Sequence, residues 1–376
     1  MIAPALLSLA IWIGLLAFRN GFWLARDTDA GMAPAPASWP AVTAVVPARD
    51  EADVIGRAIA SLVAQDYPGD FRILLVDDGS SDGTAAIARR AAGASGRLST
   101  IEGTPPPAGW TGKLWAMQRG VEAADDAPAY FWFTDADIAH APDTLRSLVA
   151  RSAQRGLVLD SLMAELRCDS LAEKALIPAF VFFFQMLYPF GRVNRPAARM
   201  AAAAGGCMLV RRDALDRAGG LAAIADAIID DCAMGAALKR QGPIRLSLTR
   251  RSVSLRPYGG WPEIVAMISR SAYAQLGYSP WMLAGTLAGL ALLYVVPPLL
   301  GLFGHGGAQL AAALAWAAMA VCFQPMLRFY RRSPLWGVAL PAIGVVYGAA
   351  TALSAWQHFR GRGGMWKGRA QARMQR

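Results

Sequence analysis

Four long apolar segments and one extended polar stretch divide this chain of 376 residues. The apolar segments lie near 2–18, 281–303, 308–327 and 335–359, are almost uncharged, and are each close to the ~20 residues that a helix needs to cross a bilayer. Between the first two lies a stretch from about 41 to 278 in which short apolar runs are separated by charged turns. The pattern predicts an integral membrane protein with one soluble domain.

The polar stretch opens with repeats of strand, turn and helix. Residues 41–46 are a short run rich in β-branched side chains, and apolar residues then recur at helical spacing. A second strand followed by a helix is predicted at 73–76, and a third strand at 130–134, where the sequence reads YFWFT. Strands that alternate with helices predict an α/β fold with a Rossmann-like, mostly parallel sheet.

Acidic side chains follow each predicted strand directly: Asp50 and Glu51, then Asp77 and Asp78, then Asp135 and Asp137. A single aspartate after a strand is usually a turn former or a helix cap. Three acidic strand ends at one edge of a sheet repel each other unless a cation or hydrogen-bond donors are present. Because ligands of open α/β sheets bind at this edge, we expect a site for a metal ion or a donor-rich ligand.

The net charge of +10 is concentrated near the membrane segments. Arg19 and Arg26 follow the first segment, and six Lys or Arg residues lie from Arg360 onward. This distribution fits anionic lipid headgroups and the positive-inside rule better than it fits nucleic acid. With Arg19 and Arg26 inside, we expect a multi-pass protein of the inner membrane whose soluble domain faces the cytoplasm. Three complete C-terminal spans would put the basic tail outside, so either one proline-interrupted segment is re-entrant or the tail departs from the rule.

These patterns give a provisional division of the chain: 1–26 as a membrane anchor, 27–40 as a proline-rich and alanine-rich linker, 41–260 as the catalytic domain, 261–280 as an interfacial amphipathic segment, 281–359 as a membrane block, and 360–376 as a basic tail. The first segment is read as an uncleaved anchor and not as a signal peptide, because it lacks a basic start and a small-residue cleavage site. The four cysteines have no CxxC spacing, so a thiolate metal site is not expected.

One apolar segment, 175–190, lies inside the polar stretch and reads ALIPAFVFFFQMLYPF. At sixteen residues it is short for a membrane span and too apolar for an exposed loop. A buried core helix and an interfacial helix both fit. We favour an interfacial helix that lets a membrane-embedded acceptor reach the active site.

Six ordered motifs resemble those of family 2 glycosyltransferases with the GT-A fold: VVPARDE, VDDGSSDGT, GWTGKLWAMQRG, TDAD, AAGGCMLVRRDAL and IIDDCAM. The resemblance covers about 42–234. The anchor, the membrane block and MWKGRAQA are similar to the membrane-bound subgroup that includes hopanoid-associated and ceramide-glucosyltransferase-like enzymes.

The resemblance implies a role for each acidic motif. Asp135 and Asp137 match the DxD motif, whose carboxylates hold Mg²⁺ or Mn²⁺ and, through the ion, the donor diphosphate. Asp231 matches the general base of inverting members, although IIDDCAM also reads as the start of a helix, and both roles are compatible.

Donor-binding positions also follow from the resemblance. Asp78 matches the residue that binds the nucleoside, with Pro47, Ala48 and Glu51 lining the same pocket, since carboxylates accept hydrogen bonds from ribose hydroxyls and from the base. Lys113 matches a lysine that faces the donor, and a solvated loop lysine is the alternative.

Two further features of the motifs stay open. In AAGGCMLVRRDAL, the paired glycines Gly205 and Gly206 permit close approach to a ligand or simply tight packing, and Arg211 and Arg212 are candidate anion ligands. The Q-x-x-R-W motif of processive synthases is reduced to Arg270, which is predicted to contact either the pyrophosphate or lipid phosphate.

The resemblance therefore implies a membrane-bound inverting transferase that moves one sugar from a nucleotide-sugar donor, preferably a UDP-sugar, to a lipid hydroxyl such as that of a hopanoid. A polyprenyl-phosphate acceptor is the alternative within the enzyme class. A membrane scaffold that has lost the chemistry is the alternative outside it, and the presence of all the acidic motifs argues against that reading. A dehydrogenase is disfavoured because the first turn reads PARDEAD and lacks G-x-G-x-x-G.

Overall fold

The computed structural model describes residues 1–124, 128–361, 365–366 and 369–370. Its chain forms two compact units. The sheet unit comprises 27–166, 192–257 and the segment from 365, and the helical unit comprises 1–26, 167–191 and 258–364. Most of the predicted basic tail, 360–376, lies outside the described residues. The predicted limits of the catalytic domain, 41–260, stay a prediction, and the segment 167–191 inside them groups with the helical unit.

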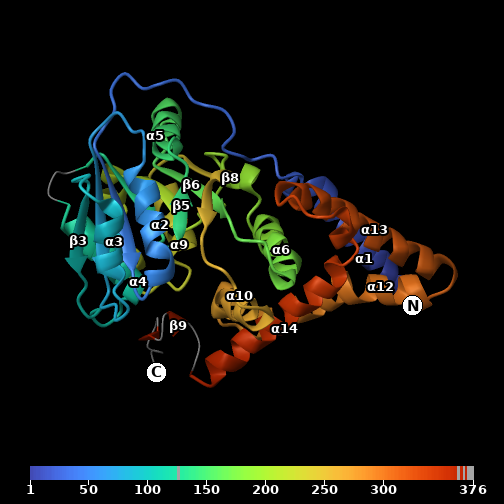
Figure 1. Ribbon diagram of the computed structural model, residues 1–376. Helices are drawn as coiled ribbons and strands as arrows, with labels where there is room; N and C mark the ends of the chain where they lie inside the picture. The colour runs from blue at the N-terminus through green and yellow to red at the C-terminus, as the bar shows by residue number, and fades with distance from the viewer. Residues whose placement is uncertain (125–127, 362–364, 367–368, 371–376) are drawn as a thin grey trace. The chain divides into compact units, whose positions relative to one another are not determined.

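An eight-stranded mixed sheet forms the centre of the sheet unit, with the order β3-β2-β1-β4-β7-β6-β8-β5 (Figure 1). The strands are β1 Val42–Ala48, β2 Phe71–Asp77, β3 Leu98–Glu102, β4 Tyr130–Thr134, β5 Ile138–His140, β6 Leu159–Glu165, β7 Cys207–Arg211 and β8 Ile244–Ser254. Strands β3, β2, β1 and β4 are parallel to one another, whereas β7 runs antiparallel to both β4 and β6. The predicted α/β fold with a mostly parallel sheet is confirmed.

Helices cover both faces of this sheet. They are α2 Ala52–Val63, α3 Thr84–Ala92, α4 Gly112–Glu122, α5 Thr144–Arg155, α8 Arg212–Arg217 and α9 Asp230–Lys239. Strand β1 is buried at every position, as expected for a strand with helices on both faces. Ala44 and Val46 pack in one core with Ile55 and Ile59 of α2. On the other face α4 approaches so closely that a side chain at Gly120 would collide with Val45.

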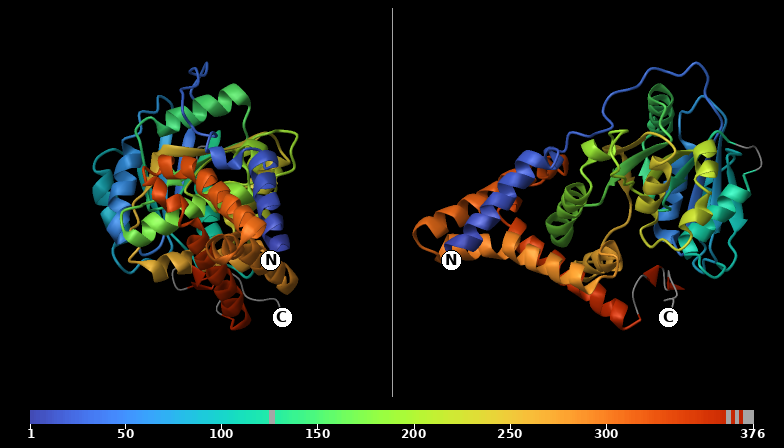
Figure 2. Two further views of the ribbon diagram at one scale, coloured as in Figure 1. Left: turned by 90° about the vertical axis from the view of Figure 1, so that its right-hand side faces the viewer. Right: turned by 180° about the vertical axis from the view of Figure 1, so that it is seen from behind.

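The helical unit is built from apolar helices: α1 Ile2–Phe18, α6 Leu171–Leu187, α10 Trp261–Gln275, α11 Pro280–Leu290, α12 Val296–Phe303, α13 Gly306–Phe329 and α14 Leu340–Phe359. A π-helical turn, Ala291–Val295, joins α11 to α12, and the short helix α7 Phe190–Val193 follows α6. Helices α1 and α13 lie side by side (Figure 2). Two short strands, β9 Met365–Trp366 and β10 Arg369–Ala370, pair antiparallel near the end of the chain.

Among the described residues, three helices are long and apolar enough to cross a membrane: Leu171–Val193, Pro280–Phe303 and Gly306–Phe329. The last two are the predicted spans at 281–303 and 308–327. The predicted segment at 335–359 is instead divided between a 3₁₀ turn, Pro334–Gly337, and α14, which is not among the three. The first segment, 2–18, is a shorter apolar helix.

The segment 175–190, judged too short for a span, belongs to the first of these three helices. Helix α6 begins with a capping box in which Ser170 and Glu173 each bond the other's backbone N–H. Phe182 is fully buried and packs edge-on against Phe323, while Phe183 packs against Tyr294 and Tyr347. Its aromatic side chains thus serve helix packing, and delivery of an acceptor by this helix stays a proposal.

Inside the sheet unit, a buried ion pair joins α5 to β6. Arg151 Nε donates to Asp160 Oδ2 at 2.6 Å, and Asp160 has no exposed surface. Burial raises the pKa of Asp160 although Arg151 opposes the shift. Such a pair resists separation because either charge alone would be left buried and uncompensated.

We expect Arg151→Met to destabilise the sheet unit by about 3–5 kcal/mol, because it leaves the Asp160 carboxylate buried without its counter-ion. Chemical denaturation of the detergent-solubilised chain measures this change. Arg119→Met is the control, since it removes an exposed pair with Glu122 and should change stability by less than about 1 kcal/mol. Equal effects of the two substitutions would contradict the argument.

Candidate active site

The acidic strand ends meet at one edge of the sheet, as the sequence predicts. In the register of β1 and β2, Ala48 lies opposite Asp77, so the two strands end level with each other. Strand β4 runs parallel to β1 on its other side and delivers Asp135 beyond Thr134. The antiparallel β7 begins at this same edge, since Cys207 pairs with Thr134. Loops from four strands therefore converge here.

The buried side chain of His140 fixes the end of β4. His140 Nε2 lies 2.8 Å from Thr134 Oγ1, and its Nδ1 lies 2.9 Å from Ser252 Oγ on β8. Burial lowers the pKa of His140 to about 3, so the imidazole is neutral at physiological pH. It holds the strand from which Asp135 emerges and does not act as a proton donor.

Lys113 is the centre of the first charge cluster. It is the second residue of α4, a helix whose start is capped by the Thr111 side chain. Its Nζ lies 2.9 Å from Asp135 Oδ1 and 3.0 Å from Asp230 Oδ2. Burial alone would lower the pKa of Lys113, but Asp135 and Asp230 outweigh it and hold the pKa above its usual value. Lys113 is thus a half-buried, ion-paired cation and not a solvated loop lysine.

Asp231 lies beside this cluster in the first turn of α9. Its Oδ2 accepts from the Gly205 N–H at 3.0 Å, and its Oδ1 accepts from the Cys232 N–H at 2.7 Å. Burial and the neighbouring charge of Asp230 raise its pKa to about 6, against the opposing effect of Lys113. A carboxylate with a pKa near the working pH is suited to general-base catalysis. The prediction that IIDDCAM begins a helix is also confirmed, because Asp230 and Asp231 are the first residues of α9.

The paired glycines have different surroundings. A Cβ at Gly205 would lie 3.3 Å from Lys113 Nζ and 3.5 Å from Asp231 Cβ, so this glycine lets the backbone N–H reach Asp231. A Cβ at Gly206 would instead meet the side chain of Ile138. Gly205 therefore serves the site and Gly206 serves packing.

The candidate anion ligands Arg211 and Arg212 are not at the site. Because β7 is antiparallel to β4, Arg211 pairs with Tyr130, at the opposite end of β4 from Asp135. Both arginines instead form ion pairs on α8, Arg211 with Asp213 and Arg212 with Asp216. The sequence did not reveal the direction of β7, so this prediction was wrong.

Asp137 belongs to a second charge cluster and does not share the partners of Asp135. Its Oδ2 accepts from Arg256 Nε at 2.9 Å, and Arg256 Nη2 donates to both carboxylate oxygens of Glu51 at 2.6 and 2.7 Å. Arg256 lies just beyond β8, in the sequence SLRPYGG. Sequence reasoning missed this residue, and the only signal was an arginine close behind a strand.

The predicted nucleoside-binding residues lie together at the ends of β1 and β2. Asp78 is buried, and its backbone N–H donates to the Ala48 carbonyl at 2.8 Å. Arg49, which the sequence reading also missed, donates to the Asp78 carbonyl, and its Nη1 lies 3.7 Å from Asp78 Oδ2. Arg270, by contrast, is an exposed residue of α10 in the helical unit, and its phosphate contact stays a prediction.

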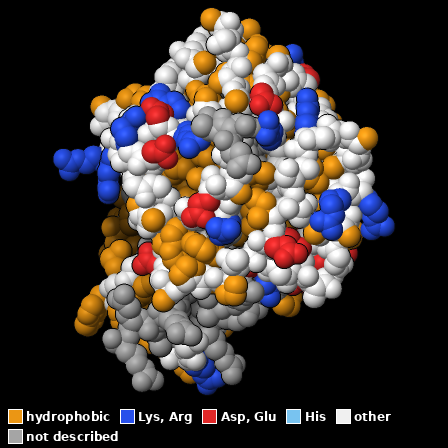
Figure 3. Space-filling view, turned by 90° about the vertical axis from the view of Figure 1, so that its left-hand side faces the viewer, with side chains coloured by type: hydrophobic (Ala, Val, Ile, Leu, Met, Phe, Trp, Pro, Cys, Tyr) orange, Lys and Arg blue, Asp and Glu red, His pale blue; other side chains and the backbone are white. Residues whose placement is uncertain are grey.

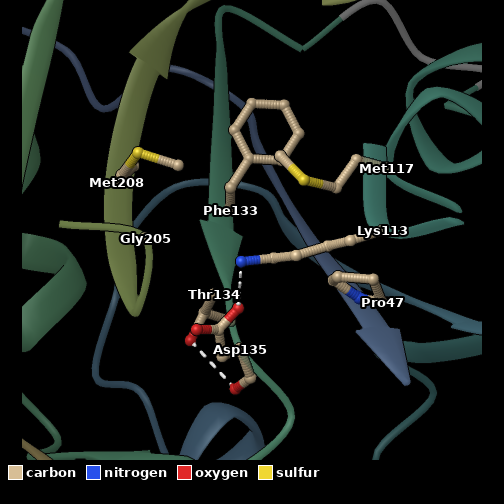
Figure 4. Close-up of a pocket in the computed structure, with 8 residues that line it drawn as sticks. All are labelled: Pro47, Lys113, Met117, Phe133, Thr134, Asp135, Gly205 and Met208. Atoms are coloured by element: carbon tan, nitrogen blue, oxygen red, sulfur yellow. Dashed lines mark hydrogen bonds and ion pairs between the residues drawn. The ribbon is translucent and has the colours of Figure 1, made fainter. Parts of the chain in front are cut away.

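A small pocket opens beside Lys113 (Figure 4). Its lining combines polar and apolar residues: Pro47, Lys113, Met117, Phe133, Thr134, Asp135, Gly205 and Met208. Figure 4 shows Lys113 reaching across the pocket to Asp135, with Phe133 and the two methionines above it. The ammonium group thus lies in the wall of this pocket, held by Asp135 and Asp230.

The donor set suits a hard divalent cation shared with a ligand. Carboxylate oxygens are the ligands that Mg²⁺ prefers, and it commonly uses one or two carboxylates plus substrate phosphates. Within the described ranges, no three His, Cys, Asp or Glu side chains are grouped closely enough to hold an ion by themselves. Asp135 and Asp137 therefore fit an ion completed by phosphate oxygens and not a closed protein cage.

The basic excess is not gathered into one patch on the face in Figure 3. There acidic and basic side chains lie among each other, with hydrophobic patches between them (Figure 3). A long-range field that attracts polyanions requires a surface dominated by one sign of charge. The face in Figure 3 carries charges of both signs and does not provide such a field.

The mixed sheet with acids at the ends of its parallel strands defines a GT-A transferase fold. Residues 43–219 match the family model described as Glycosyl transferase family 2. This segment is thus similar to family 2 glycosyltransferases, as its motifs predicted. The mannosyltransferase PcManGT from Pyrobaculum calidifontis, whose structure holds GDP-Man and Mn²⁺, has a similar fold, with a TM-score of 0.55 and 22% identity over 93% of this chain and 99% of that one.

Two curated relatives are similar over shorter stretches. An N-acetylglucosaminyltransferase of Rhizobium leguminosarum bv. viciae is 29% identical over 36% of this chain. The succinoglycan biosynthesis protein ExoU of Rhizobium meliloti (strain 1021) is 38% identical over 16% of it. The chain spans only 30% and 17% of the lengths of these relatives.

Proposed function

We propose that this protein is an inverting glycosyltransferase that moves one sugar from a nucleotide-sugar donor to a hydroxyl group of a membrane lipid. The observation that carries the proposal is the position of Asp231. Its carboxylate is held by two backbone N–H groups beside Lys113, which in turn pairs with Asp135 of the DxD motif. A base and a cation for a leaving diphosphate thus lie side by side.

Asp231 is the proposed general base. A lipid alcohol is a weak nucleophile at neutral pH, so its attack needs a positioned group that takes the hydroxyl proton. As the new bond to the anomeric carbon forms, the bond to the diphosphate breaks and negative charge develops on the leaving group. Lys113 faces that charge from the pocket wall, where low dielectric strengthens the interaction.

The donor is proposed to lie along the ends of β1, β2 and β4. Asp78, Pro47, Ala48 and Glu51 would bind its nucleoside, with Lys113 and Asp135 toward the diphosphate. The GT-A fold shared with a GDP-Man-bound mannosyltransferase supports a nucleotide-sugar donor. A uracil base is the preferred assignment from the motifs.

A divalent cation, Mg²⁺ or Mn²⁺, is proposed to bind at Asp135 and Asp137. When bound, it would act as a Lewis acid that neutralises charge on the diphosphate. The carboxylate donor set and the Mn²⁺ in the similar mannosyltransferase structure support this assignment.

The acceptor is proposed to be a lipid at the cytoplasmic face of the inner membrane, with a hopanoid as the candidate that the motifs favour. The three apolar helices that meet the requirements for a span support membrane insertion. Arg19 and Arg26 would contact anionic lipids. Helix α6 presents the exposed side chains of Leu171 and Leu187, which suits contact with lipid.

The decisive experiment is to incubate the detergent-solubilised protein with a panel of nucleotide sugars and total bacterial lipid. Mass spectrometry should then find a lipid heavier by one hexose or N-acetylhexosamine. A product on polyprenyl phosphate would replace the proposed acceptor. The absence of any product with every donor would overturn the catalytic proposal in favour of a binding scaffold.

We expect EDTA to silence sugar transfer and Mg²⁺ or Mn²⁺ to restore it. Asp137→Ala should lower kcat by at least about 100-fold, because an ion acting as a Lewis acid contributes several kcal/mol. Asp213→Ala is the matched control, since this acid is exposed on α8 and pairs with Arg211. Full activity in EDTA would refute the metal assignment.

We expect the pH profile of kcat/KM to identify Asp231. Its carboxylate must be ionised to accept a proton, and its pKa is raised to about 6. Activity should therefore rise with pH through about 6 and level off above it. Asp231→Asn should remove this limb and lower turnover by ~10²–10⁴, the usual contribution of a general base.

Asp230→Asn is the control for this experiment, because Asp230 pairs with Lys113 and is not assigned the proton transfer. Asp230→Asn should lower turnover less than Asp231→Asn does, and its kcat/KM should still rise with pH as in the wild type. Nucleotide-sugar binding should be near normal in Asp231→Asn. If Asp231→Asn turns over at the wild-type rate, another group is the general base.

We expect Leu187→Asp to lower transfer to lipid by about 10-fold while donor binding is unchanged, because a charge at the hydrocarbon boundary opposes contact with lipid. Leu187 is exposed on α6, so the substitution spares the helix core. Phe183→Asp provides the comparison, since it breaks the contacts with Tyr294 and Tyr347 and should unfold the helical unit. Unchanged lipid glycosylation in Leu187→Asp would remove α6 from the acceptor route.

A further inference from the structure

Arg256 joins three parts of the sequence that lie far apart. Its Nε donates to Asp137 Oδ2 in the DxD motif, 119 positions away. Its Nη2 donates to both oxygens of Glu51, which is 205 positions away in the turn after β1. The Glu51 side chain is 10% exposed and that of Asp137 is 16% exposed, so this guanidinium compensates two largely buried charges.

The guanidinium is not saturated by these contacts. Nε and Nη2 are used, whereas Nη1 has no hydrogen-bond partner among the residues that the structure describes. The side chain is 34% exposed, so this free edge is accessible. The free Nη1 can donate to one phosphate oxygen, and two parallel N–H bonds to a phosphate become available once the guanidinium releases an acid.

The net charge of the cluster determines how strongly it can bind a divalent cation. Glu51, Asp137 and Arg256 together carry one net negative charge, and a divalent ion on Asp137 would reverse that sign beside a fixed guanidinium. The repulsion between neighbouring cations is strong where water is partly excluded. A diphosphate brings several negative charges and gives Arg256 a new partner, which removes this repulsion.

We propose that Arg256 is a diphosphate-binding residue that pairs with Asp137 and Glu51 before the donor binds and then turns to the donor's diphosphate, so that divalent cation and donor bind cooperatively. This inference rests on the proposed function and adds a residue to its donor site. The cation alone binds weakly because Arg256 already neutralises Asp137. Nucleoside diphosphate alone binds weakly because the acids at the sheet edge oppose it.

Titration of the full chain in detergent with Mn²⁺, followed by electron paramagnetic resonance, tests the proposal. In the wild type, saturating UDP or GDP should tighten Mn²⁺ binding by about 5- to 150-fold, the usual range of a coupling between sites. In Arg256→Gln, Mn²⁺ alone should bind about tenfold more tightly than in the wild type, and the coupling should fall below about 3-fold. By reciprocity, Mn²⁺ should then no longer strengthen nucleotide binding.

Arg250→Gln is the matched control, because Arg250 lies on β8 and faces Glu165 at 4.0 Å, away from Asp137. Its Mn²⁺ and nucleotide affinities should equal those of the wild type. If thermal melting shows that Arg256→Gln does not fold, the double variant Glu51→Gln with Arg256→Gln keeps the local charge balance and should lose the coupling in the same way.

The outcomes separate this inference from the proposed function. Unchanged Mn²⁺ affinity and coupling in a folded Arg256 variant would overturn the role of Arg256, even if the wild type transfers sugar. Cooperative binding of Mn²⁺ and nucleotide that depends on Arg256, in a protein that glycosylates no lipid, would overturn the transferase proposal and leave the role of Arg256 in place.

Discussion

Compensation of negative charge at one edge of the sheet is the constraint on which this structure depends. Glu51, Asp135, Asp137, Asp230 and Asp231 converge there, and two cations, Lys113 and Arg256, form ion pairs with four of the five. Without these cations the acids would repel each other in a region where water is partly excluded. The ion pairs therefore hold the loops at this edge in place.

The rest of the sheet unit positions these groups. Strands β1 and β2 are flanked by helices and end level with each other, so the acids that follow them meet at one edge. Neutral His140 ties the end of β4 to β8, from which the chain continues to Arg256. The antiparallel β7 adds Gly205, whose lack of a side chain allows a backbone N–H to hold Asp231 next to Lys113. Rigid elements thus support a site made of loops, which is the usual division of labour in such folds.

The helical unit follows different packing rules. Its interior is filled with aromatic rings, including Trp12 against Tyr294 and Phe182 against Phe323, and its surface exposes large apolar side chains such as Trp281 and Phe303. A soluble protein rarely exposes such a surface without a partner, and a bilayer is the partner that apolar helices of this length suit. Helix α6 lies in this unit although the sequence places it between strands of the sheet unit, so the chain passes repeatedly between the two.

The sequence by itself determined the parts of this protein that depend on local patterns. The apolar runs at β1, β2 and β4, which alternate with helical patterns, predicted a parallel sheet. The acids that follow these runs predicted a ligand site at one edge, because a strand end is visible in the sequence as an abrupt change from apolar to charged residues. The ordered motifs predicted the family. Tertiary structure alone decided which charges meet. Arg256 pairs with Glu51, Lys113 pairs with Asp230, and Arg211 lies away from the site. All three depend on strand order and direction, which contacts between residues far apart in the sequence establish and which no local pattern encodes.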